Sequence, residues 1–162
     1  MKEAGGELTH VDAQGRLRMV DVTEKEPSWR EARAEGSVHM AGETLKRVCD
    51  QTITKGNVLE AARLAAILAS KRTWELIPLC HAIQLTGVDV DFETVFEDSS
   101  IRIRSRVVTR DRTGVEMEAL VAVTHAALTI YDMCKAIDRG MTIDQVRLTY
   151  KSGGRSGTYE HV

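Results

Sequence analysis

Aromatic residues make up only 4% of this chain of 162 residues, and the formal net charge is only −2. A protein that binds nucleic acid usually combines a basic surface with aromatic rings on which bases stack. Neither feature is present here, since acidic and basic residues nearly balance and no segment is rich in aromatic residues. We therefore expect no nucleic-acid partner.

Cysteine is also rare, and Cys49, Cys80 and Cys134 are widely spaced, with no Cys-x-x-Cys pair. An odd, scattered set of cysteines is typical of a reducing compartment rather than of a disulfide framework. The sequence contains no apolar run of the roughly 20 residues that a membrane-spanning helix needs, and no segment typical of a signal peptide. We expect a cytoplasmic protein with no membrane partner.

The length suits one domain, residues 1–162, with residues 1–7 and about 152–162 predicted to be flexible. Two long apolar helices are predicted, one over residues 58–71 and the other from residue 119 to about residue 137. Asn57 is a suitable N-cap for the first of them. Helices that are apolar on nearly every side must be covered by a sheet or by another subunit, so we expect an oligomer.

A hairpin is predicted between the two long helices, because apolar residues alternate with acidic residues over 88–93 and with arginines over 101–107. Opposite charges on neighbouring strands stabilise a register, so we interpret the arginine row as structural. A shorter helix is predicted over 43–50, and residues 28–35 are predicted to form a helical turn or a mobile loop. Residues 8–11 and 17–22 flank residues 12–15, which are predicted to form a small hairpin or turn. Further short strands are predicted at residues 37–40 and 146–150.

The predicted order is strand, helices, strand, strand, helix, strand. This is the β-α-β-β-α-β plan of a ferredoxin-like α+β fold, in which helices pack on one face of an antiparallel sheet. The sequence therefore predicts this fold class.

The second long helix carries charges at both ends, although its sequence is mostly apolar. Glu116 and Glu118 lie at its start, and Asp132 and Lys135 near its end. Buried charges are costly unless they are paired or used. Asp132 and Lys135 are one turn apart and can interact. Glu118, His125 and Asp132 recur every seven residues, which predicts one polar stripe, either functional or simply solvated.

The start of this helix has two interpretations. If residues 115–118 are extended, Glu116 and Glu118 point to the same side and can share a site. Alternatively, Thr113 and Glu116 form a capping box ahead of the apolar run. We favour the extended interpretation.

The remaining candidate residues lie in loops. Lys55 precedes a predicted helix start, where an anion is favoured, or it is an ordinary exposed lysine. His81 ends an apolar loop and either donates to a ligand or relays a proton, or it simply satisfies a local hydrogen bond. Residues 151–157 are basic and rich in glycine, and either wrap phosphate oxygens or form a frayed end. We expect no zinc site, because no second ligand pair accompanies Cys80 and His81.

Several strings, in the same order, resemble the cyclic pyranopterin monophosphate synthase family of molybdenum cofactor biosynthesis, from about residue 8 to residue 157. LIPLCH, GVEMEAL and TIYDMCKA are the most specific; the others are MVDV (19–22), REARAEG (30–36), KG (55–56) and KSGG (151–154). Two positions differ from the family: Ala82 stands where proline is usual, and His125 stands where a small or aliphatic residue is usual. The tail beyond residue 157 also departs.

The resemblance implies a ferredoxin-like homohexamer, a trimer of dimers with active sites between subunits. It implies a lyase that converts 3′,8-cyclo-7,8-dihydro-GTP into cyclic pyranopterin monophosphate and pyrophosphate. By motif it implies that Asp132, Lys135 and Lys55 are catalytic. It also implies a set of substrate-binding residues: Leu79, Cys80, His81, Met117, Glu118, Glu116, Arg30 and Lys151. No cofactor or protein-bound metal is implied, although Mg²⁺ could accompany the triphosphate.

Our hypothesis is that Lys135 and Lys55 move protons while Asp132 orients Lys135. General acid–base groups typically contribute about 10²–10⁴-fold each. Neighbouring cations and partial burial would lower the pKa of such a lysine. The alternative is a non-catalytic nucleotide-binding or regulatory domain of the same fold.

Overall fold

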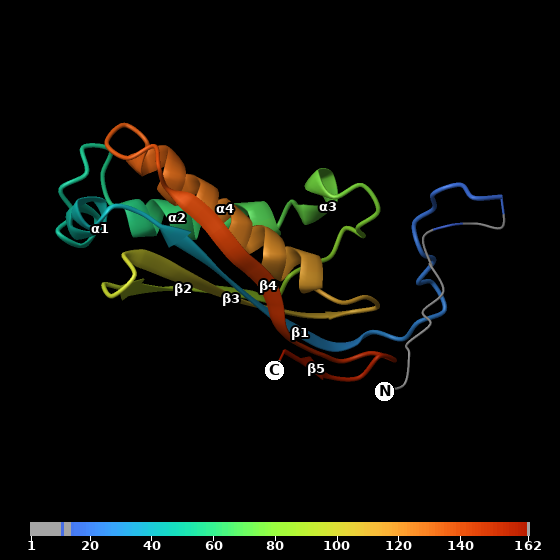
Figure 1. Cartoon of the computed structure of the whole chain (residues 1–162). Coiled ribbons are helices and arrows are strands. Elements are labelled where there is room, and N and C mark those ends of the chain that lie inside the picture. The colour runs from blue at the N-terminus through green and yellow to red at the C-terminus, as the bar shows by residue number, and fades with distance from the viewer. Residues whose placement is uncertain (1–10, 12–13, 162) are drawn as a thin grey trace.

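Five antiparallel strands form one open sheet in the order β2-β3-β1-β4-β5 (Figure 1). This computed structural model describes residue 11 and residues 14–161. The strands are β1 (Ser28–His39), β2 (Gly87–Val95), β3 (Ser100–Asp111), β4 (Thr142–Ser152) and β5 (Tyr159–Glu160). The helices are α1 (Gly42–Cys49), α2 (Val58–Ser70), α3 (Thr73–Leu76) and α4 (Glu116–Cys134). The predicted ferredoxin-like α+β fold is confirmed.

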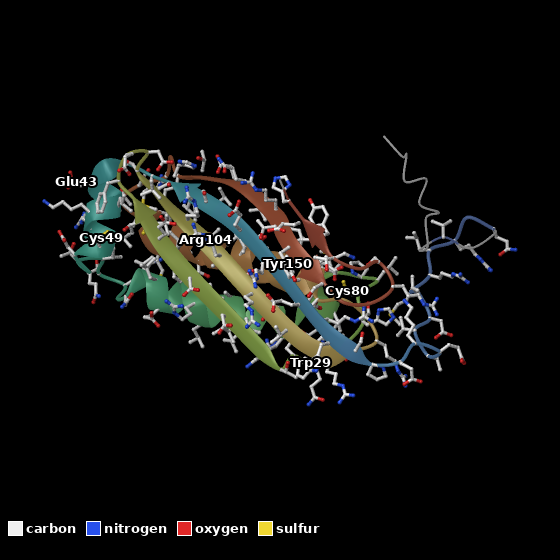
Figure 2. All side chains as sticks on the ribbon, turned by 90° about the horizontal axis from the view of Figure 1, so that it is seen from below. Trp29, Glu43, Cys49, Cys80, Arg104 and Tyr150 are labelled. Atoms are coloured by element: carbon white, nitrogen blue, oxygen red, sulfur yellow. The ribbon has the colours of Figure 1, made fainter. Side chains whose placement is uncertain are left out.

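The helices cover one face of the sheet, and the other face is open (Figure 1). Figure 2 shows that open face, with Arg104 and Tyr150 upon it. Small side chains let α2 and α4 pack closely on each other and on the sheet: Gly36 of β1 has no Cβ, and a Cβ there would lie 2.8 Å from Val123 of α4. The alanines on the inner faces of the two helices are fully buried: Ala62, Ala66, Ala119, Ala122 and Ala126.

Strand β1 corrects the prediction for residues 28–35, which are neither a helical turn nor a loop. Ala32 and Ala34 face the core, while the charged residues that alternate with them face the open side, where Glu31 and Glu35 pair with arginines of neighbouring strands. Glu31 accepts from Arg106 at 2.8 Å, and Glu35 from Arg147 at 2.6 Å. In this part of the strand the residues that face the core are alanines, and the residues that face outward are long and charged. The alternation of large apolar and polar residues that usually predicts a strand is therefore weak here.

The hairpin predicted between the two long helices is confirmed as β2 and β3. Three acidic residues of β2 lie opposite three arginines of β3: Asp89 opposite Arg106, Asp91 opposite Arg104, and Glu93 opposite Arg102. The Glu93 carboxylate pairs with two arginines, at 3.3 Å and 2.7 Å. The arginine row therefore has carboxylate partners within the sheet, as the structural interpretation predicts.

The helices predicted at residues 43–50 and 58–71 are confirmed as α1 and α2. The Asn57 Oδ1 accepts from the Glu60 amide at 3.2 Å and caps α2 as predicted. The start of α1 is stabilised by a residue that is remote in the sequence, since the Asp138 carboxylate accepts a hydrogen bond from the Ala41 amide at 2.8 Å.

Both interpretations of the start of α4 are wrong. The helix begins at Glu116 with Val115 as its N-cap, and no side chain among the described residues caps it. Val115 is 1% exposed, so burial of this residue in the core, rather than a local capping signal, fixes where the helix starts.

The two ends of the chain are described in part. Val11 and Leu17 form an antiparallel bridge, consistent with the predicted turn, while residues 1–10 and 12–13 lie outside the described residues. At the other end, β5 returns along β4, with Lys151 opposite Tyr159. The flexibility predicted for this tail remains a prediction. None of the described helices is long and apolar enough to cross a membrane.

Candidate active site

A pocket of about 900 Å³ opens where α4 begins, at one end of the sheet. Figure 2 places Cys80 at this end of the molecule and Cys49 at the other. Residues 20–26, which we call the strap, form one wall, and the loops that follow α3, β3 and β4 form the others. All the residues predicted to bind substrate line this pocket: Arg30, Leu79, Cys80, His81, Glu116, Met117, Glu118 and Lys151. The fold thus gathers them in one place, while their roles remain predictions.

Arg30 is held rigidly in the pocket wall. Its Nε donates to the Asp111 carbonyl at 3.3 Å, and its Nη2 to the Arg112 carbonyl at 3.2 Å. On its other side lies the glycine-rich turn after β4, where Gly154 has φ +74°. A Cβ at Gly154 would collide with the Arg30 Nη1, so glycine is needed both for the backbone conformation and for this contact.

Lys151 reaches the same space from the end of β4. Its Nζ donates to the Ser156 hydroxyl at 2.6 Å and pairs with the Glu116 carboxylate at 3.3 Å. Further cationic side chains line the pocket: Lys25, Arg112 and Arg155. Several cations around one cavity can bind a polyanion through charge-assisted hydrogen bonds.

Glu118 is the buried carboxyl of the pocket, with only 3% of the residue exposed. Burial is the main reason that its pKa rises, to about 7, and the charge of Glu116 raises it further, although its own backbone amide lowers it. Near neutral pH this group therefore exists as both acid and carboxylate. Burial, followed by the charge of Glu118, also raises the pKa of the Cys80 thiol.

His81 is tied to the strap. Its Nε2 lies 2.7 Å from the Val20 carbonyl oxygen, across 61 positions of the sequence. The contact between the strap and His81 could not be predicted from the sequence, because it uses a backbone oxygen and does not depend on the residue type. The string MVDV, which resembles the family, was the one signal in this segment.

The predicted catalytic residues form a second group, away from this pocket. The Lys135 Nζ lies 2.6 Å from one oxygen of Asp132, and the Lys55 Nζ lies 3.2 Å from the other. Lys55 also donates to the Asp132 backbone carbonyl at 2.7 Å. All three side chains are exposed, with 58% of the Asp132 side chain accessible. The predicted Asp132–Lys135 interaction is confirmed.

The charges of this second group reinforce one another. Hydrogen bonds from Lys135 and then from Lys55 lower the pKa of Asp132, and Asp132 in turn raises the pKa of Lys135. The prediction of a lowered lysine pKa is therefore wrong for Lys135 in a single chain. The reason is that its nearest charge is a carboxylate and that solvent surrounds it.

Glu118 lies in the first turn of α4 and Asp132 in its last turn. From Glu118 to Asp132 the helix rises roughly 21 Å, at about 1.5 Å per residue. The predicted polar stripe is not uniformly exposed, because Glu118 is buried at the pocket, Asp132 lies in solvent, and His125 bonds to the Val121 carbonyl one turn back. Within one chain, the second group is too distant to act on a small molecule bound in the pocket.

The MoaC family matches residues 19–154, a span that includes the second group and all the predicted pocket residues. The chain belongs to the MoaC family. Curated relatives named cyclic pyranopterin monophosphate synthase cover nearly all of it. One, from Thermoanaerobacter sp., is 56% identical over 94% of this chain and 97% of its own length. Another, from Thermomicrobium roseum, is 57% identical over 94% of this chain and 92% of its own.

A third MoaC relative, from Mycobacterium bovis, is named cyclic pyranopterin monophosphate synthase 3; it is 54% identical over 98% of this chain and 89% of its own length. These names confirm the predicted family and the prediction of an enzyme. In the part of this MoaC chain that the structure describes, no three His, Cys, Asp or Glu side chains are grouped to hold a metal ion.

Proposed function

We propose that this protein is a cytoplasmic cyclic pyranopterin monophosphate synthase. It converts 3′,8-cyclo-7,8-dihydro-GTP into cyclic pyranopterin monophosphate and releases pyrophosphate. The observation that carries the proposal is the pocket at the start of α4, where Arg30, Lys151 and Arg155 surround a cavity of about 900 Å³. A triphosphate needs several cations, and a fused purine-derived ring needs a cavity of this size. The names of the relatives support the same reaction.

We propose further that each active site combines the pocket of one copy with Asp132, Lys135 and Lys55 of a second copy. The separation along α4 supports this arrangement, because the two groups cannot meet within one chain. A two-fold axis that crosses α4 near its middle would set the two helices antiparallel. The end of each helix would then approach the start of the other, which gives two equivalent sites per dimer.

The outer faces of α2 and α4 support such a contact between copies. Leu64 and Leu68 on α2 are 60% and 49% exposed, and Leu128 on α4 is 52% exposed. An isologous contact buries the same apolar patch on both partners, and these leucines offer one. Three such dimers would form the homohexamer of the proposal.

The chemistry that we propose uses the second group as proton carriers. Asp132 pairs with Lys135 through one carboxylate oxygen and with Lys55 through the other, so both side-chain nitrogens lie close to one another and can face the same substrate. In the exposed state Asp132 raises the pKa of Lys135. Burial of Lys135 between subunits, near the cations of the pocket, would ease the loss of its proton. Mg²⁺ could accompany the triphosphate, and no step is assigned to it.

The test is to incubate the purified protein with 3′,8-cyclo-7,8-dihydro-GTP and to measure pyrophosphate and pterin product over time. The proposal expects both products in equal amounts. A nucleotide-binding domain without catalysis would instead show only a rise in melting temperature with the same compound, and that outcome would contradict the proposal.

A further inference from the structure

The hydrogen bond between His81 and the strap determines which ring nitrogen carries the proton. The partner of Nε2 is the Val20 carbonyl oxygen, at 2.7 Å. A carbonyl oxygen can accept a hydrogen bond but cannot donate one, so Nε2 must carry hydrogen. A neutral imidazole has a single N–H, and Nδ1 of His81 is therefore the nitrogen with a free electron pair.

We propose that the Val20 carbonyl fixes His81 in the Nε2–H tautomer and that Nδ1 accepts a proton from an N–H or O–H group of the bound substrate. The proposal rests on the proposed function, since it names a role for His81 in that site. His81 lines the pocket together with Cys80 and Glu118. Among the described residues, no hydrogen bond occupies its Nδ1.

The proton and the electron pair of the broken bond are both accounted for in this transfer. When Nδ1 takes the proton, the electron pair of the broken bond stays on the substrate nitrogen or oxygen. The ring becomes an imidazolium with two N–H groups, and the bond from Nε2 to the Val20 carbonyl becomes charge-assisted and stronger. Val20 is thus a positioning residue that acts through its backbone, in the way that a carboxylate orients the histidine of a catalytic triad. The proton then passes to solvent or to a leaving oxygen.

The strap is shaped to present this carbonyl. The Asp21 carboxylate accepts from the Thr23 amide at 2.8 Å, and the Lys25 amide donates to the Val22 carbonyl at 3.0 Å. These two local bonds form a turn directly after Val20. Because the strap is also a wall of the pocket, the same segment encloses the substrate and sets the state of the base.

The tautomer can be read directly from ¹⁵N NMR of protein labelled at histidine. His125 serves as an internal comparison, because its Nδ1 lies 3.1 Å from the Val121 carbonyl and must carry hydrogen by the same reasoning. Spectra of His81→Gln and His125→Gln assign the two rings. The proposal expects His81 with hydrogen on Nε2 and His125 with hydrogen on Nδ1. A neutral His81 with hydrogen on Nδ1, or with both tautomers equally populated, would overturn it.

The proton-accepting role is tested with a pair of variants. The amide nitrogen of His81→Gln falls near the position of Nε2 and can still donate to Val20, but it offers no base in place of Nδ1. We expect kcat to fall roughly 10²-fold or more, with Kd for the substrate and Tm close to wild type. His81→Asn loses the strap bond as well, and its Kd should rise too.

Turnover by His81→Gln at the wild-type rate would show that His81 only holds the strap, and would overturn the proposal. Failure of the proposed function would look different. In that case wild-type protein would give no product at all, while the NMR spectrum would still decide the tautomer.

Discussion

Lys151 pairs with Glu116 at 3.3 Å, and Glu118, two residues further along the same helix, has no cation partner among the described residues. One carboxylate of the first turn of α4 is thus neutralised by a salt bridge. The other is buried, and burial raises its pKa to about 7. The surroundings of these two carboxyl groups therefore differ, and burial suits Glu118 to act as an acid or base of the site.

Replacing Glu118 by glutamine should change how stability depends on pH. The pKa of Glu118 is about 7 in the folded chain against an ordinary 4.5, so the folded state binds more protons than the unfolded state between these values. The free energy of unfolding therefore falls as pH rises through this window, by about 3 kcal/mol in total. In Glu118→Gln this decrease in the free energy of unfolding with rising pH should disappear.

Urea unfolding at about pH 5 and about pH 8 measures this difference. Glu97→Gln, a change at an exposed position in the β2–β3 turn, is the control and should keep the full pH dependence of wild type. Equal pH dependence in wild type and Glu118→Gln would contradict the assignment of the buried acid.

Replacing Gly154 by alanine should weaken substrate binding. The new Cβ would collide with the Arg30 guanidinium and displace it from the pocket wall. We expect Kd for the cyclised nucleotide to rise about 10-fold or more, equivalent to about 1.4 kcal/mol. Titration calorimetry measures this change.

Gly157→Ala is a matched control for Gly154→Ala. Gly157 has φ +66°, so alanine suffers a similar backbone cost of roughly 1–2 kcal/mol, but nothing lies within 4 Å of its Cβ position. Stability should therefore fall in both variants, and affinity only in Gly154→Ala. If both variants bind equally well, Arg30 does not depend on the glycine contact.

Replacing Lys135 by alanine should abolish turnover while substrate binding is largely kept. Lys135 lies outside the pocket of its own chain, and the proposal makes it a proton carrier rather than a binding group. A loss of at least about 10²-fold in kcat is expected from removal of an acid–base group. Lys46→Ala, at an exposed position of α1 toward the same end of the molecule, should turn over normally. Near-normal turnover by Lys135→Ala would refute the assignment.

Elements with strong local signals could be predicted from the sequence. Asn57 marks the start of α2 because capping is a local interaction, and the β2–β3 hairpin follows from alternating apolar residues with acidic side chains on one strand and basic side chains on the next. The start of α4 could not be predicted, because burial of Val115 in the assembled core decides it. The end of β1 follows the strand predicted at residues 37–40, but its first part could not be predicted, because Ala32 and Ala34 are too small to make its inward face recognisable as apolar.

The residues of the site were predicted by resemblance, but their arrangement was not. Glu118 and Asp132 share one helix in the sequence, and only the structure places one in a buried pocket and the other in solvent. The strap could not be predicted to contact His81, because the contact uses the Val20 carbonyl and every residue has a carbonyl.

The central claim is that each site is completed by a second copy, and subunit complementation tests it most directly. Glu118→Gln damages the pocket and Lys135→Ala damages the other group, so each variant alone should be inactive. In a mixed dimer, one site would combine both lesions and the other would be intact. Coexpressed variants that assort randomly should therefore recover about a quarter of wild-type turnover, since half of the dimers are mixed and half of their sites are intact. If mixed assemblies, isolated with two different affinity tags, show no recovery, the site lies within one chain and the account is contradicted.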